Sequence, residues 1–176
     1  AVEHLIALGR TRIAHVTGPE GFVSVKDRAS AYRAAVGANG TVLYGQWSEA
    51  WGHDAVDRLW KGAERPDGIF CGNDQIARGV VDALRERGVN VPEDVSVVGF
   101  DNWEIVASQT RPPLTSVDMN LKALGREAGR LVLELAEGKP VEPGVRKLPC
   151  QLVIRQSCGG SAAGAERRGG LVAPVD

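Results

Sequence analysis

The sequence predicts an α/β fold in which a parallel sheet carries helices on both faces. Short apolar runs alternate with segments of helical periodicity, and the order strand, helix, strand recurs along the chain. Parallel strands need crossover connections, and helices supply them. The chain has 176 residues, enough for one domain or the larger part of a two-lobed one. The runs expected to form strands are 13–17, 42–44, 68–71, 95–100 and 148–154.

Three segments between these runs have apolar residues at helical spacing, and each such set forms one apolar stripe of a predicted helix. The first follows Ser24 and Asp27, which have the spacing of a capping box with Asp in place of Glu. The second is expected to end at Gly62, and the third ends in basic residues before Gly88, as the helix dipole favours. The apolar positions of the stripes are Ala29, Tyr32 and Val36; Trp51, Ala55 and Leu59; and Ile76, Val80 and Leu84.

The last third of the chain breaks this alternation. Residues 111–115 contain two adjacent prolines and cannot lie inside a helix, because proline lacks an N–H donor. Apolar residues, four leucines and one alanine, then follow at helical spacing from Leu121 to Leu135. This spacing predicts an amphipathic helix that ends near Gly138. We expect its stripe to pack in a core rather than form a coiled coil, because it spans barely two heptads. The Gly/Ala-rich segment 159–176 is predicted to be disordered.

Charge and composition exclude several classes of protein. The chain has 21 Lys and Arg residues and 22 Asp and Glu residues. This near-neutral charge argues against a domain that binds the phosphate backbone of a nucleic acid by itself. No apolar run approaches the ~20 residues of a membrane span. The first residues read as a helix already under way, without an initiator Met or a signal peptide, so we expect the chain to be part of something longer.

Cysteine and histidine positions suggest no metal or thiol chemistry. Three cysteines without CxxC spacing favour a reduced, cytoplasmic protein. Cys71 lies in an apolar run, so we expect an inert packing residue rather than a nucleophile. The three histidines fall in separate elements, which argues against a metal site: His4, His15 and His53.

Polar side chains follow the expected strands where each one ends. In a parallel sheet, ligands bind at the carboxyl ends of the strands, so these groups are expected to converge on one rim. The set contains a guanidinium group, an aromatic ring, amides and carboxylates. The polar groups can hydrogen-bond the hydroxyls of a sugar, and the ring can pack against its apolar face. The residues are Arg28, Trp47, Asn73, Asp74, Asp101 and Asn102.

Each of these residues also has a structural interpretation. Asn73 and Asp74 could cap the third helix, and Trp47 could be a core aromatic. Arg28 could pair on the surface with Asp27 or Glu20. Asp101 is harder to assign to structure alone, since no regular element obviously begins there. Their shared location is what favours a binding site.

A catalytic site is not indicated. The sequence has no dinucleotide-binding loop, no phosphate-binding P-loop and no GxSxG nucleophile elbow. Asp74 with Asp101 could form an acid/base pair, but no nucleophile or electrophile accompanies them. We therefore expect a non-enzymatic protein without cofactor.

The ordered segments together resemble the LacI/GalR family of bacterial transcriptional repressors. The resemblance rests on the signatures NDxxAxG and VPxDVSVVGFDN, followed by PPLTSV, and runs over about residues 2–158 in order and spacing. The matching stretches are 4–18, 24–36, 67–102, 111–117 and 148–157.

This resemblance implies an effector-binding core of the periplasmic-binding-protein type, with two lobes around a cleft. Residues 11–117 and 145–158 match the C-terminal lobe, residues 1–10 the end of an N-terminal-lobe helix, and 118–144 the return helix and linker of that lobe. The helix-turn-helix headpiece that reads operator DNA is absent, so this chain alone is not expected to bind an operator.

The resemblance also implies functional residues and partners. The effector, expected to be a sugar, is contacted by Arg28, Trp47, Asn73 and Asp101, and Phe22 is expected to add apolar lining. Met119 occupies a crossover position that carries a polar contact in relatives. A homodimer is implied, with candidate interface residues Val80, Val81 and Trp103, for which core burial is the alternative.

Two rival functions remain open on the sequence. One is a periplasmic sugar receptor of the same architecture without a DNA role; PPLTSV and VPEDVSVVGFDN favour the repressor over it. The other is an α/β enzyme that acts on a sugar through Asp74 and Asp101.

Overall fold

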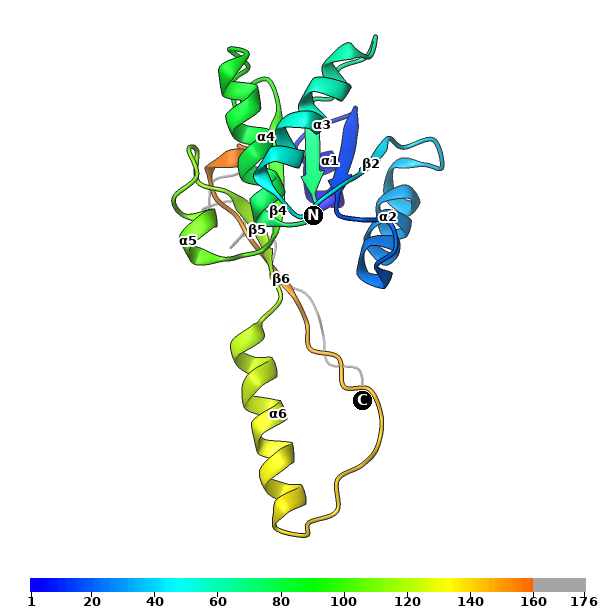
Figure 1. Ribbon diagram of the computed structural model, residues 1–176, viewed down its shortest axis with the longest axis vertical. Helices are drawn as coiled ribbons and strands as arrows, with labels where there is room; N and C mark the ends of the chain where they lie inside the picture. The colour runs from blue at the N-terminus through cyan, green and yellow to red at the C-terminus, as the bar shows by residue number, and fades with distance from the viewer. Residues whose placement is uncertain (160–176) are drawn as a thin grey trace.

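The computed structural model describes residues 1–159 (Figure 1), so the segment predicted to be disordered, 159–176, lies outside the described residues except for its first residue. Helices and strands alternate through most of the chain, as the periodicity predicts. The elements are α1 (Val2–Ala7), β1 (Ile13–Thr17), α2 (Val23–Val36), β2 (Val42–Tyr44), α3 (Glu49–Lys61), β3 (Gly68–Cys71), α4 (Asp74–Glu86), β4 (Ser96–Asp101), α5 (Glu104–Ala107), β5 (Thr115–Asp118), α6 (Leu121–Ala136), β6 (Gln151–Val153) and the 3₁₀ turn η1 (Gln156–Cys158).

One six-stranded sheet organises the described residues. Its strand order is β2-β1-β3-β4-β5-β6, and every neighbouring pair is parallel except β5 with β6. All five expected strand regions contain a strand, and the α/β fold class is confirmed. The prediction missed β5, which follows the two prolines and joins β6 to the sheet. The sequence gives little sign of this strand, because Thr115–Asp118 is short, mostly polar and directly follows a proline-containing segment.

Helices cover the two faces of the sheet. On one face, α3 and α4 pack against alternate residues of β1 and β3, such as Val16 and Ile69. On the other face, α1 and α2 bury Leu5 and Tyr32 against residues such as Phe70. This two-sided burial explains why β1 and β3 read as continuous apolar runs rather than alternating ones.

The predicted helix boundaries hold at α4 and fail at α2. Gly88 has a φ of 67°, the left-handed conformation expected just after a helix. The capping box at Ser24 and Asp27 is wrong, because α2 begins two residues earlier than the box requires, at Val23, with Phe22 as N-cap and no side-chain capping bond. Gly62 does end α3, but with a φ of −70° rather than a left-handed one.

The last long helix, α6, projects away from the sheet, and the chain returns beside it toward β6 (Figure 1). None of its residues is buried, and Leu121, Leu124 and Leu135 of the predicted stripe are exposed. The prediction that this stripe packs in a core is therefore wrong for the described residues. No helix among residues 1–159 is long and apolar enough to span a membrane.

His15 lies fully buried in the middle of β1. Its ring stacks on Phe70 with centroids 4.6 Å apart, and its Nδ1 lies 2.9 Å from the Phe70 carbonyl oxygen. Its Nε2 has no hydrogen-bond partner in the part of the chain that the structure describes. Burial, with smaller contributions from Arg28 and Arg33, lowers the pKa of His15 to about 4.

We expect acid to destabilise the fold through His15. Between pH 6.5 and about 4, the unfolded chain binds a proton at this residue and the folded chain does not, so stability falls as pH falls through this window. Thermal unfolding of the wild type and of His15→Phe at pH 7 and pH 5 measures the effect. The wild type should lose more stability than His15→Phe when the pH is lowered from 7 to 5. An equal loss in both proteins would contradict the role of His15 in acid destabilisation.

Candidate functional site

The predicted site residues come from separate elements at the carboxyl edge of the sheet. Phe22 and Arg28 belong to the N-cap and second turn of α2, which follows β1. Trp47 follows β2, Asn73 follows β3 as the N-cap of α4, and Asp101 is the last residue of β4. Since β1 to β4 run parallel, these five residues share one rim.

Arg28 and Asp101 form the charged part of the rim. The guanidinium carbon of Arg28 lies over the Phe100 ring, 3.8 Å from its centroid, in a cation–π contact. Burial raises the pKa of Asp101 to about 6, the charge of Asp74 adds to this, and Arg28 opposes it. Burial likewise lowers the pKa of Arg28, against the charge of Asp101. Arg28 and Asp101 thus lie close enough for the charge of each to affect the pKa of the other.

Phe22 and Trp47 form an aromatic corner. Their ring centroids lie 6.2 Å apart in an edge-to-face arrangement. The indole of Trp47 lies against Gly18, where a Cβ would overlap it, so the glycine directly after β1 is what lets the ring approach. Phe22 is 53% exposed and Trp47 is half-buried, although Trp47 also packs against the core. The corner offers an apolar face of the kind that a sugar ring covers.

Asn73 caps α4, as its structural interpretation proposed. Its Oδ1 accepts a hydrogen bond of 2.8 Å from the Ile76 N–H. The cap fixes the side chain at the mouth of the β3–α4 turn, where it is 9% exposed. Capping and ligand contact are compatible here, since the cap engages the oxygen and leaves the amide nitrogen as a donor.

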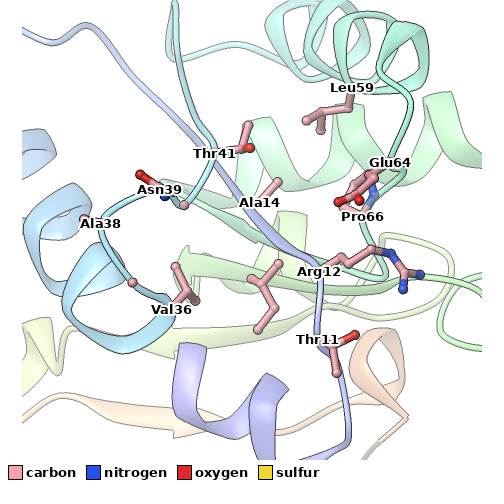
Figure 2. A pocket seen from close by; sticks show the side chains of 13 residues that line it. Thr11, Arg12, Ala14, Val36, Ala38, Asn39, Thr41, Leu59, Glu64 and Pro66 are labelled. Atoms are coloured by element: carbon pink, nitrogen blue, oxygen red, sulfur yellow. The ribbon is translucent and has the colours of Figure 1, made fainter.

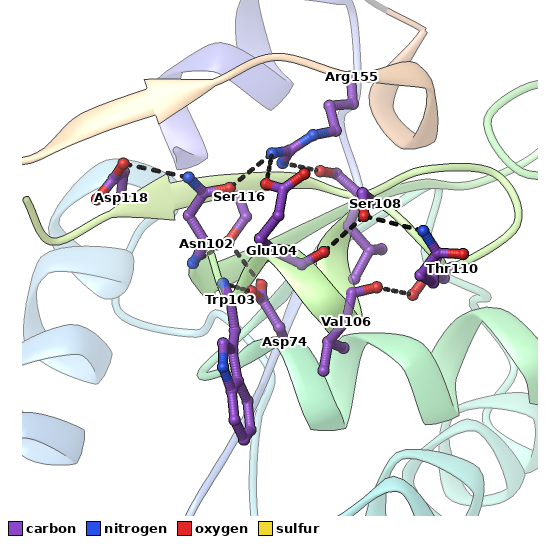
Figure 3. A network of polar contacts seen from close by, with 12 residues as sticks. Asp74, Asn102, Trp103, Glu104, Val106, Ser108, Thr110, Ser116, Asp118 and Arg155 are labelled. Atoms are coloured by element: carbon purple, nitrogen blue, oxygen red, sulfur yellow. Dashed lines mark hydrogen bonds and ion pairs between the residues drawn. The ribbon is translucent and has the colours of Figure 1, made fainter.

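Asp74 and Asn102 belong instead to a polar network beside the rim (Figure 3). The Asp74 carboxylate accepts hydrogen bonds from Ser116 Oγ at 2.6 Å and Trp103 N at 2.7 Å. The Asn102 amide donates to Asp118 and accepts from Arg155. Burial raises the pKa of Asp74 against these hydrogen bonds. Asp74 is 1% exposed and already engaged, which disfavours it as an acid/base partner of Asp101.

The three candidate interface residues divide into two groups. Val80 and Val81, at 0% and 1% exposure, belong to the core that α4 forms with α3 and the sheet, which was their alternative interpretation. Trp103 is 55% exposed. Cys71 is buried, and burial raises the pKa of its thiol, as expected for a packing residue. Among residues 1–159, no three His, Cys, Asp or Glu side chains are placed to hold a metal ion.

Two hollows adjoin the rim. Asp101 lines one of about 700 Å³, together with Trp103, Met119 and Lys122. Arg28 lines another of about 350 Å³, between α1 and α2, with Phe70 and Phe100 on its floor. Phe100 was not predicted, although its position directly before Asp101 in the apolar run could have indicated it.

A further cavity of about 410 Å³ opens at the opposite edge of the sheet (Figure 2). It lies between the α2–β2 and α3–β3 loops, and Asn39, Thr41 and Glu64 line it. Its one guanidinium, on Arg12, is held by the Arg65 carbonyl oxygen at 2.8 Å and by Asp67. None of the predicted rim residues reaches it.

A parallel sheet with helices on both faces and polar side chains at its carboxyl edge defines a ligand-binding α/β lobe. Residues 2–158 match the periplasmic binding protein-like domain family. The chain belongs to this family and is homologous to LacI/GalR-type transcriptional regulators.

Three comparisons illustrate the relationship. The HTH-type transcriptional regulator CelR of Thermobifida fusca is 35% identical over 163 residues, which cover 89% of this chain and 48% of CelR. The structure of a CelR–cellobiose complex superimposes with a TM-score of 0.78 at 35% identity, covering 89% of this chain and 50% of that one. The structure of the lac repressor dimer bound to operator and the anti-inducer ONPF superimposes with a TM-score of 0.78 at 33% identity. The match covers 89% of this chain and 48% of the lac repressor chain. The chain thus spans about half the length of these relatives.

Proposed function

We propose that this chain is the sugar-sensing part of a LacI/GalR-type transcriptional regulator. The observation that carries the proposal is the convergence of Arg28, Asp101, Asn73 and Trp47, with Phe22, on one rim of the sheet. Arg28, Asp101 and Asn73 supply donors and acceptors for hydroxyl groups, and Trp47 with Phe22 supplies an apolar face.

We further propose a division into lobes and a mode of control. Residues 11–117 and 145–158 form one lobe of the effector domain, and 118–144 belong to the second. Residues 1–10, which the resemblance assigns to the second lobe, pack through α1 on the sheet of the first. Operator DNA is bound by a helix-turn-helix domain outside these 176 residues, in a cytoplasmic homodimer that uses Trp103 at its interface. Sugar binding stabilises one arrangement of the lobes and so sets the spacing of the two DNA-reading helices.

The exposed stripe of α6 supports this division. A helix with an apolar face and no buried residue requires a covering surface, which a second lobe provides. A sugar receptor without a DNA role is not favoured, because the relatives are transcription regulators. No feature of the rim calls for catalysis, so we propose a binding protein without cofactor.

A panel of sugars that includes cellobiose, tested by thermal shift and then calorimetry on the full protein, tests the proposal. A bound sugar raises the melting temperature, and the increase grows with the logarithm of the sugar concentration relative to Kd. A panel without a binder, or binding that the rim variants Arg28→Ala and Trp47→Ala leave unchanged, would reject the proposed site.

The affinity for the sugar is expected to fall as pH drops through about 6. Sugar hydroxyls donate to the ionised form of Asp101, and its raised pKa means that this form is lost near pH 6 rather than near 4. Calorimetry between pH 5 and 8 measures this profile. Asp101→Asn is the control, and its affinity should be lower at pH 8 and flat across the range. A flat profile in the wild type would contradict the role of the carboxylate.

A further inference from the structure

The loop that carries Asp101 has a backbone conformation that needs support. Asp101 and Asn102 have φ values of 103° and 51°, in the left-handed region that side-chain-bearing residues rarely adopt. Such residues cost free energy and persist only where the surroundings hold them. The conformation turns the chain sharply between the end of β4 and the start of α5.

Two side chains hold the backbone on the far side of this turn. Asp74 Oδ2 accepts from Trp103 N at 2.7 Å, and Ser116 Oγ accepts from Asn102 N at 3.0 Å. Ser116 in turn donates to Asp74 Oδ1 at 2.6 Å, so the two side chains act as one unit (Figure 3). Both are at most 1% exposed, which strengthens these bonds relative to water.

The sequence makes room for this unit. A Cβ at Gly99, two residues before Asp101, would overlap Asp74 Oδ1, so only glycine lets the carboxylate approach β4 so closely. Asp74 is the first residue of α4 and Ser116 lies in β5, so the turn is fixed to two other elements of the lobe. A wider polar frame surrounds it, in which Arg155 donates to Asn102 at 2.8 Å and Asn102 to Asp118 at 3.1 Å.

We propose that Asp74 and Ser116 are positioning residues for effector binding, which clamp the turn at 101–103 so that the Asp101 carboxylate faces Arg28 before the sugar arrives. This inference rests on the proposed function and adds a role for two side chains that do not themselves reach the rim. A preorganised carboxylate costs less to order on binding, and affinity rises accordingly.

Hydrogen exchange of the full protein without sugar tests the clamp directly. In Asp74→Ala, the amides of residues 100–103 should exchange on the order of tenfold faster, because a buried bond to a charged acceptor is lost. Ser116→Ala should show the same local effect, and it replaces Asp74→Ala if that variant does not fold. Asp74→Asn should restore protection, since its amide oxygen still accepts from Trp103 N. Asp82→Ala is the matched control, because it removes a carboxylate from the same helix that pairs with Arg85 and, among residues 1–159, with no other charged group.

Binding of cellobiose to the same variants gives the functional readout. We expect Asp74→Ala to weaken it on the order of tenfold and Asp74→Asn to rescue it. Unchanged exchange at 100–103 in Asp74→Ala and Ser116→Ala, or faster exchange spread evenly over the sheet, overturns the clamp whether or not cellobiose binds. Absence of any sugar binding together with local loss of protection instead overturns the proposed function and leaves the clamp standing.

Discussion

Gly79→Ala is expected to lower the free energy of unfolding by about 3 kcal/mol, because the two helices that cross at this position have no space for a methyl group. A Cβ at Gly79 in α4 would overlap the backbone carbonyl of Glu49, at the start of α3. Gly52 of α3 faces the α4 backbone in the same way. Backbone atoms cannot move out of the way by changing rotamer, as a flexible side chain can. The helices must therefore move apart, which loosens the core between them.

Urea unfolding of the full protein measures this effect. Arg78→Ala is the matched control, since it places alanine at the neighbouring position of α4, where the side chain is half-buried and makes a 3.8 Å ion pair with Glu49. It should change stability by less than about 0.5 kcal/mol. Equal midpoints for Gly79→Ala and Arg78→Ala would show that the contact between α3 and α4 is not as close as described.

Arg28→Ala is expected to weaken sugar binding by at least ~1.5 kcal/mol, more than tenfold, because one charge-assisted hydrogen bond contributes about that much. The loss has a second source, since Asp101 would keep its burial but lose the opposite charge that opposes the rise in its pKa. Arg28→Lys should restore only part of the affinity, because an ammonium cannot form two parallel hydrogen bonds or stack flat on Phe100.

Calorimetry on the full protein with a sugar found in the panel provides the measurement. Arg33→Ala is the control, because Arg33 lies on the same helix, is exposed, and is not part of the rim. Its affinity should match that of the wild type. If Arg28→Ala and Arg33→Ala bind the sugar equally well, the guanidinium of Arg28 takes no part in recognition.

Periodicity and the alternation of strands and helices along the chain were enough to predict most of this fold. Apolar runs that are buried on both faces are typical of parallel strands, and β1 and β3 have that pattern. Because parallel strands present their carboxyl ends at one edge, the rim from Arg28 to Asp101 could be predicted from the residues that follow each run.

Features that depend on tertiary contacts could not be predicted in this way. The short polar strand β5 is stable because it hydrogen-bonds to β4 and β6, which no local pattern records. The burial of Asp74 and its bonds to Ser116 and Trp103 join segments 29 to 42 residues apart in sequence. The left-handed backbone at Asp101 and Asn102 is followed by backbone N–H groups that bond to this network.

Fluorescence anisotropy of the full protein on its operator, with and without a bound sugar, tests the central claim most directly. A sugar that binds the rim should change operator affinity roughly 5- to 150-fold, which corresponds to a coupling of about 1–3 kcal/mol. Arg28→Ala should bind operator normally and lose most of this response. A sugar that binds tightly at the rim but leaves operator affinity unchanged would contradict the assignment of this chain as the sensor of a transcriptional regulator.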